Sequence, residues 1–264
     1  MVPNEILCQI FGFLDHDTLK TCAVVCPDLA ERHLYAAITI GNCFHSQSQA
    51  LEESGYVLNP DALDLLINKN PRVAQYARTL LIDLPLYGSH KTCFVKLTRL
   101  ESITLCHRSS PYYDTWPQLS SDFKSAFLAS LCSPFLKEVR ILSITQFPLS
   151  TLLGFNPFKL KRLTVQSRDV NTETVNSRLQ NEEPHLESLE LIHDNNAIET
   201  LISQANLVNL RHLFLTIVFD QGGSSILRLL QTCSASLNTL QVYCPTFRKF
   251  SPLPEPRQQI DKFL

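Results

Sequence analysis

Apolar residues recur after residue 75 in one fixed pattern: an apolar position, two residues, a second apolar position, one residue and a third apolar position. Seven segments follow it: Ala77-Leu80-Ile82, Leu100-Ile103-Leu105, Leu136-Val139-Ile141, Leu160-Leu163-Val165, Leu186-Leu189-Leu191, Leu210-Leu213-Leu215 and Leu237-Leu240-Val242. The alternation that ends each segment predicts a short strand whose apolar side chains face one side of a sheet.

The segments are almost evenly spaced, since their first residues are 23, 36, 24, 26, 24 and 27 positions apart. Helix-like apolar stretches precede most strands, at 62–67, 123–131, 197–205 and 225–231. A strand and a helix in each unit, stacked on their neighbours, would bury a continuous core. Five of the six spacings fall within the ~20–29-residue period of leucine-rich repeats, so residues 61–244 resemble a leucine-rich-repeat solenoid with about seven short parallel strands.

The resemblance has departures. Leucine-rich repeats often carry Asn or Cys three residues after the last leucine, but here these positions hold Pro85, Arg108, Ile144, Arg168, Asp194, Val218 and Pro245. The predicted solenoid is therefore irregular. The alternative is an ordinary α/β domain in which abundant leucine, about 16% of the chain, produces chance matches. The longest spacing contains an aromatic-rich stretch at 107–117, which predicts a loop insertion. Its aromatics either bind a partner or pack the loop down.

The first forty residues predict three short helices. Apolar positions at helical spacing mark the first helix: Val2, Ile6, Leu7, Ile10, Phe11 and Leu14. Asp15 or Asp17 can cap a second helix that runs through Leu19, and residues 28–34 can form a third. Helices this small cannot bury their apolar faces alone, so the rest of the chain or a partner must cover them.

This region resembles the F-box. The residues that carry the resemblance are Pro3, Glu5-Ile6, Ile10-Phe11, Leu14-Asp15, Thr18-Leu19, Cys22 and Val25-Cys26. They span about residues 1–40 in the family's order and look most like the F-boxes of large fungal families. Val2 stands where the family usually has leucine, and Leu29 stands where a tryptophan is common. Both residues are apolar. The alternative is a small helical subdomain that packs on its own chain.

The resemblance implies docking onto a Skp-type adaptor, which links an F-box protein to a cullin scaffold and a RING subunit. Such a contact places apolar anchors in the pockets of a groove. The expected adaptor-binding residues are Pro3, Ile6, Leu7, Ile10, Phe11 and Leu19. Some of these residues must instead hold the three helices together, and the pattern does not divide them.

The expected organisation is a mixed α and α/β chain in four parts. An F-box at 1–40 is followed by a polar linker at 41–60, the repeat region at 61–244 and a proline-containing tail at 245–264. In the repeat region, the residues between the strand's apolar positions should point away from the core. Arginine and aromatic residues dominate interface energetics, so we expect a protein substrate to contact Arg140, Arg162, His212 and Phe214 there.

Charge and composition narrow the function classes. The net charge of −2, from 23 basic and 25 acidic residues, argues against a nucleic-acid binder that works by charge. No segment reaches the ~20 apolar residues that span a bilayer, and the N-terminus does not have the pattern of a signal peptide. Nine scattered cysteines are typical of free thiols in a reducing compartment, so we expect a cytoplasmic or nuclear protein.

Motifs for enzyme chemistry are not found in the sequence. It has no G-x-S-x-G, G-x-x-x-x-G-K-[ST], H-E-x-x-H or C-x-x-C motif, so we expect no catalytic residues, no metal site and no cofactor. The favoured function is the substrate-recognition subunit of a cullin-RING ubiquitin ligase, itself non-catalytic. A scaffold with the same two parts and no role in ubiquitylation is the alternative, and an unrecognised enzyme is the third.

Overall fold

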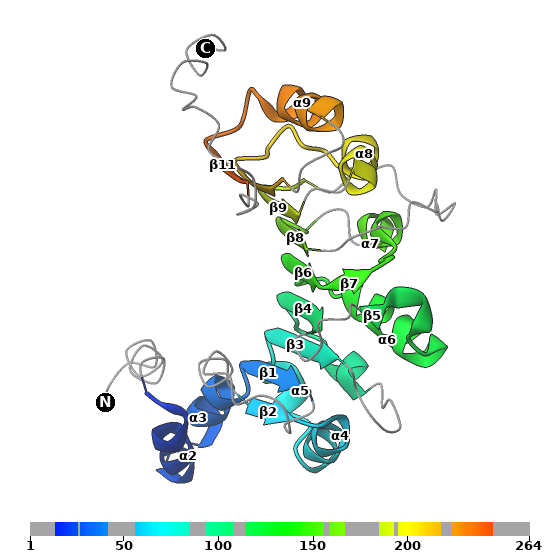
Figure 1. Cartoon of the computed structure of the whole chain (residues 1–264). Coiled ribbons are helices and arrows are strands. Elements are labelled where there is room, and N and C mark those ends of the chain that lie inside the picture. Colours follow the sequence, from blue (N-terminus) through cyan, green and yellow to red (C-terminus); the bar gives the residue numbers. More distant parts are fainter. Residues whose placement is uncertain are drawn as a thin grey trace, which may run out of the picture.

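The computed structural model describes residues 14–25, 27–41, 56–84, 93–107, 114–155, 159–166, 185–192, 195–217 and 223–244. Within these ranges the main feature is a nine-stranded sheet in which every neighbouring pair runs parallel. The strand order is β11-β10-β9-β8-β6-β4-β3-β1-β2 (Figure 1). From β3 onward each new strand of this sheet joins the same edge. The predicted class, mixed α and parallel β, is confirmed.

In all seven segments of the apolar pattern the second and third apolar positions lie in a strand, and the first lies two residues before it. These strands are β3 (Thr79–Leu84), β4 (Ser102–His107), β6 (Glu138–Leu142), β8 (Arg162–Gln166), β9 (Ser188–Ile192), β10 (His212–Thr216) and β11 (Thr239–Tyr243). Their apolar positions are aligned by register, so that Leu163 lies beside Leu189 and Leu189 beside Leu213. All three leucines are buried.

Two strands of the sheet were not predicted. They are β1 (Ala37–Ile40) and β2 (Tyr56–Leu58), in the ranges expected for the F-box and the linker. The β1 sequence Ala-Ile-Thr-Ile alternates with period two, and its Ile38 and Ile40 pair with Leu80 and Ile82 of β3. The sheet thus extends beyond the N-terminal limit expected for the repeat region.

The helices α4 (Pro60–Lys69), α6 (Ser121–Leu131), α7 (Leu149–Phe155), α8 (Asn195–Gln204) and α9 (Gly223–Cys233) lie along one face of the sheet (Figure 1). Four of them contain the predicted helical stretches. Side chains at the first residues cap two of these helices. The Asn59 side chain accepts a hydrogen bond from the Ala62 N–H at 2.7 Å at the start of α4, and the Ser120 hydroxyl accepts one from the Phe123 N–H at 3.3 Å at the start of α6. The main core lies between these helices and the sheet.

The aromatic-rich stretch is only partly a loop. β4 continues to His107, β5 (Asp114–Thr115) pairs with β7 (Ile144–Thr145) in a small second sheet, and the 3-10 helix η3 (Trp116–Gln118) follows. Trp116 is buried, with its ring centroid 4.9 Å from that of Phe147 and 5.8 Å from that of Phe127. Trp116 therefore packs this segment against the core and does not present its ring to a partner, because the core offers two edge-on aromatic neighbours. Of the two alternatives for the aromatic residues, packing is the one that holds at Trp116.

The N-terminal helices α2 (His16–Val25) and α3 (Pro27–Leu34) have a small apolar cluster of their own, formed by Leu19, Ala30 and Leu34. Asp15 caps α2, as predicted: its carboxylate accepts from the Thr18 N–H at 2.8 Å. Tyr35 packs against both this cluster and the main core. Tyr35 therefore connects the apolar cluster of the N-terminal helices with the main core.

Candidate functional site

The sheet face opposite the helices carries the side chains between the buried apolar positions, and we call it the free face. Strand register aligns these side chains in two rows across the sheet. The first row contains Ser102, Glu138, Arg162, Ser188, His212 and Thr239. The second row contains Thr104, Arg140, Thr164, Glu190, Phe214 and Gln241. The sequence predicted this face correctly, because side chains alternate along a strand.

All four predicted substrate-binding residues lie on the free face. Arg140, Arg162 and His212 are exposed, and Phe214 is half-buried. Only the two arginines share a contact: they meet at Glu138. His212 and Phe214 lie on β10, two strands from β8, so their backbones are about 10 Å from Arg162. The structure therefore divides the predicted set into two groups. Arg140 and Arg162 share the Glu138 carboxylate, and His212 and Phe214 lie apart from them on β10.

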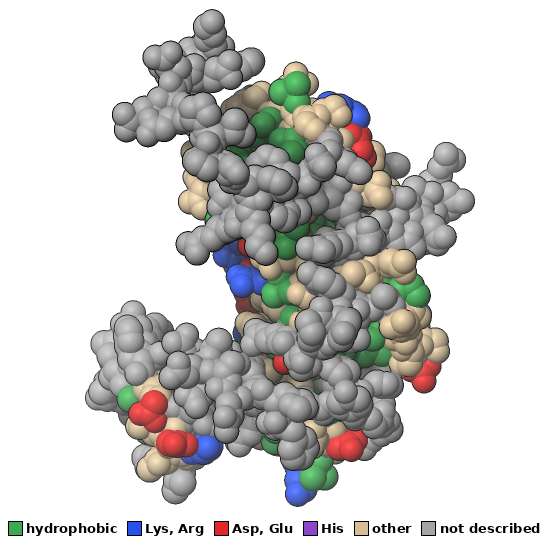
Figure 2. All heavy atoms as spheres, viewed as in Figure 1, with side chains coloured by type: hydrophobic (Ala, Val, Ile, Leu, Met, Phe, Trp, Pro, Cys, Tyr) green, Lys and Arg blue, Asp and Glu red, His purple; other side chains and the backbone are tan. Residues whose placement is uncertain are grey.

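Glu138 is the centre of the ionic cluster, because its side chain is only 12% exposed. Arg140 Nε donates to Glu138 Oε1 at 2.7 Å, and Arg162 Nη2 lies 3.3 Å from Glu138 Oε2. One carboxylate thus faces two guanidinium groups, which leaves one net positive charge. Figure 2 shows basic and acidic side chains together on this side of the sheet, at the level of β6 and β8.

The neighbouring strands are linked by uncharged donors. Glu190 accepts from Thr164 Oγ1 at 3.3 Å and from Gln166 Nε2 at 2.8 Å, while His212 Nδ1 lies 3.2 Å from Thr239 Oγ1. Glu190 gives this part of the free face a negative charge next to the positive cluster. The face therefore offers charges of both signs and a half-buried aromatic ring, which suits binding of a polar protein surface.

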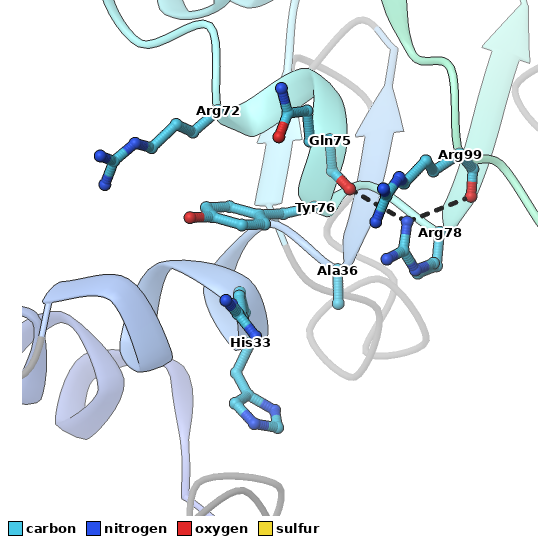
Figure 3. Close-up of a pocket in the computed structure, with 8 residues that line it drawn as sticks. His33, Ala36, Arg72, Gln75, Tyr76, Arg78 and Arg99 are labelled. Carbon is cyan, nitrogen blue, oxygen red and sulfur yellow. Dashed lines mark hydrogen bonds between the residues drawn. The ribbon is translucent and has the colours of Figure 1, made fainter. Parts of the chain in front are cut away.

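A second candidate site was not predicted. It is a pocket of about 370 Å³ between α3, the short helix α5 (Val73–Tyr76) and the segments that enter the strands. We call it the basic pocket. Its described lining residues are Arg32, His33, Ala36, Arg72, Gln75, Tyr76, Arg78 and Arg99 (Figure 3). None of these is acidic, and four are arginines.

Elements far apart in sequence position these arginines. Arg32 is in the last turn of α3, with its guanidinium carbon 5.8 Å from the centroid of the Tyr76 ring. Arg78 directly precedes β3, and its Nη1 donates to the Gln75 carbonyl at 3.0 Å and the Arg99 carbonyl at 3.4 Å (Figure 3). Burial lowers the pKa of His33, so its imidazole is less readily charged than a fully exposed one. No local motif marks this pocket, because folding brings together residues 32 to 99.

Leu19 is the one predicted adaptor-binding residue within the described ranges. It is buried, 7% exposed, and packs α2 against α3 with Ala30 and Leu34. Pro3, Ile6, Leu7, Ile10 and Phe11 lie outside the described residues, as does the tail at 245–264. A contact of these residues with an adaptor stays a prediction.

The chemistry of the described part of the chain is limited. Across residues 14–244, apart from the ranges left undescribed, no group of three His, Cys, Asp or Glu side chains is arranged to hold a metal ion. None of the six described cysteines forms a disulfide: Cys93, Cys106 and Cys233 are buried, Cys22 is half-buried, and Cys132 and Cys244 are exposed. Burial raises the pKa of the Cys93 thiol to about 11, which disfavours its thiolate.

The described helices include none with the length and apolar character needed to cross a bilayer. Comparison of the chain with models of protein families gives no match, and comparison with curated proteins gives no significant match.

Proposed function

We propose that this chain is the substrate-recognition subunit of a cullin-RING ubiquitin ligase. Its N-terminal F-box binds a Skp-type adaptor, and the free face of an irregular leucine-rich-repeat solenoid binds a protein substrate. The observation that carries the proposal is the ordered motif from Pro3 to Cys26. The positions of α2 and α3, which match the motif's second and third helices, support it.

The repeat assignment has support from a recurring backbone contact. Before seven successive strands of the main sheet, from β3 to β11, two adjacent N–H groups donate to one carbonyl of the preceding unit. The accepting carbonyls belong, in strand order, to Ala36, Arg78, Glu101, Lys137, Lys161, Glu187 and Arg211. An ordinary α/β domain has no reason to repeat one contact at equivalent positions, whereas a solenoid does.

Adaptor binding is tested with the double substitution Ile10→Ala and Phe11→Ala. Removing a buried apolar anchor costs ~2–5 kcal/mol, so losing two anchors should abolish capture of the adaptor. Phe214→Ala is the matched control, because it removes a phenyl ring from β10, which is distant in sequence from the F-box. A folded double variant that still captures the adaptor at the wild-type level contradicts the proposal.

Affinity purification during proteasome inhibition separates the proposed ligase subunit from the scaffold alternative. The ligase subunit should retain the cullin together with the adaptor, and its substrate should carry ubiquitin. The scaffold alternative predicts partners without the cullin. We place the protein in the cytoplasm or nucleus, where the ligase components act.

Substrate binding is tested with Arg162→Glu and Phe214→Ala, assayed for loss of partners while the adaptor serves as the internal control. Both residues lie on the free face, and the adaptor site is distant in sequence. Loss of partners with the adaptor retained supports the free face as the substrate-binding surface. Partners that survive both changes contradict that assignment.

A further inference from the structure

We propose that the tail segment 251–256 pairs with β11 as an antiparallel edge strand and closes this end of the sheet. β11 is the last strand in the described order and has β10 on one side only (Figure 1). Its Leu240 is 45% exposed and its Val242 is 48% exposed. Their register partners in β10, Leu213 and Leu215, are buried. The last unit therefore exposes positions that its neighbour buries, and the end of a stacked array needs a cover over such positions.

The backbone of β11 has one edge that no described strand pairs with. On the other edge, the Thr239 N–H donates to the Arg211 carbonyl and the Tyr243 carbonyl accepts from the Ile217 N–H, both at 2.9 Å. Odd-numbered residues of β11 therefore direct their polar groups toward β10, and even-numbered residues direct theirs to the outer edge. The strand contains no proline and no charged residue, the two features that commonly protect an exposed edge.

The tail has the sequence that this outer edge needs. Prolines occupy every second position from 252 to 256, and these residues lie outside the described ranges. Successive residues of a strand address its two edges in turn, so one edge of an extended 251–256 segment lacks N–H groups. The other edge keeps those of Ser251, Leu253 and Glu255. Each of these three residues also precedes a proline, which biases its backbone toward the extended region. Such a segment can pair on one side only, so it can end a sheet.

The length of the connection sets the direction of the added strand. Only seven residues separate Tyr243 from Ser251, whereas a parallel crossover needs about a dozen or more. The added strand is therefore antiparallel, an arrangement that is common at the edge of an otherwise parallel sheet. Residues that exchange backbone hydrogen bonds across such a pair point to the same face, which places Leu253 against Leu240 or Val242. One leucine covers only part of these side chains, so Leu240 still stabilises the fold less than a fully buried leucine does.

The chain's own tail suits this edge better than a second copy of the chain does. The tail begins directly after β11, and a short connection gives an effective concentration of about millimolar. A second copy would instead lose its translational and rotational freedom on binding. The inference does not depend on the proposed function, because the outer edge of β11 belongs neither to the F-box nor to the free face.

The test is amide hydrogen exchange of the full chain, measured by NMR. In the wild type we expect slow exchange at Leu240 and Val242, because carbonyl groups of the tail accept from their N–H groups. Leu253→Pro removes an N–H from the pairing edge of the tail and should speed exchange of both amides at least about tenfold. The Gln241 amide faces β10, so it should exchange slowly in both proteins and reports that the fold is intact.

Pro254→Ala is the matched control, because it adds an N–H to the outward edge of the tail and leaves the pairing edge unchanged. Exchange at Leu240 and Val242 should be as slow as in the wild type. Leu253→Ala keeps the N–H and removes the apolar side chain, so its exchange rates should lie between those of the wild type and of Leu253→Pro. Sedimentation velocity at two protein concentrations accompanies the exchange measurements and reports self-association.

Four outcomes would overturn the proposal. They are fast exchange of both amides in the wild type, equal exchange in the wild type and Leu253→Pro, loss of protection in Pro254→Ala, and protection that increases with protein concentration together with self-association. The last would assign the outer edge of β11 to a second copy of the chain.

Discussion

Glu138 on β6 and Arg162 on the adjacent strand β8 are register partners, and Arg162 Nη2 lies 3.3 Å from Glu138 Oε2. The same carboxylate accepts from Arg140 Nε, two residues along its own strand. This shared, nearly buried carboxylate fixes the two arginines on the free face and sets the distance between their charges.

Replacing Glu138 by Gln should lower the free energy of unfolding by about 1 kcal/mol. Both arginines are more than half exposed, so water screens each of their ion pairs with Glu138. The substitution nevertheless removes both ion pairs at once and leaves two guanidinium cations side by side. Urea unfolding measures the change. The matched control is Glu199→Gln, which removes one exposed pair with Arg228 and should cost less than about 0.5 kcal/mol. Equal losses in the two variants would contradict the network argument.

Leucines at equivalent positions of β10 and β11 should differ strongly in their effect on stability. Leu213 pairs in register with Leu240, but Leu213 is fully buried and Leu240 is 45% exposed. Leu213→Ala should cost ~2–5 kcal/mol, because it leaves a cavity in the core, and Leu240→Ala should cost about 1 kcal/mol or less. Chemical denaturation of both variants checks this. A Leu240 variant as unstable as the Leu213 variant would show that β11 is covered in solution.

Phe147 should be essential to the aromatic cluster around Trp116. Phe147 is fully buried, and Phe147→Ala should cost ~3–5 kcal/mol. Trp116 is the chain's single tryptophan, so its fluorescence reports on this cluster alone, and its emission should shift to longer wavelength in the variant. Phe135→Ala is the control, because Phe135 is 45% exposed and should cost about 1 kcal/mol or less. An unchanged emission maximum in the Phe147 variant would contradict the packing described above.

Glu187 should make stability depend on pH in the acid range. Lys161 Nζ donates to Glu187 Oε1 at 2.7 Å, and this bond holds the pKa of Glu187 below its ordinary value of 4.5. A lowered pKa stabilises the fold above the unfolded-state pKa, and this contribution is lost as pH falls through the folded-state pKa. Lys161→Met should raise the pKa of Glu187 toward 4.5, measured by NMR titration of the side-chain carboxyl.

The same substitution gives a second readout. The stability difference between wild type and Lys161→Met should be present at neutral pH and should disappear below the folded-state pKa of Glu187. A difference that stays constant through this range would show that Lys161 acts by packing its aliphatic chain rather than by its charge.

The sequence by itself determined seven of the nine strands of the main sheet, most of the helices and the free face. Apolar positions such as Leu189 and Leu191 repeat with period two, and a strand places alternate side chains on opposite sides whatever surrounds it. This alternation is enough to place Arg162 and Phe214 on the face opposite the core. The helix caps at Asp15 and Asn59 also depend only on residues within three positions.

Tertiary structure decided which of these residues meet. The contact between Glu138 and Arg162 depends on strand register, which the packing of many buried leucines fixes together. The basic pocket depends on how α3 and α5 dock beside β1 and β3, which brings Arg32 to the same hollow as Arg99. Long-range electrostatic sites of this kind leave no periodic trace in the chain, because the energy that assembles them comes from the apolar core and not from the charged residues themselves.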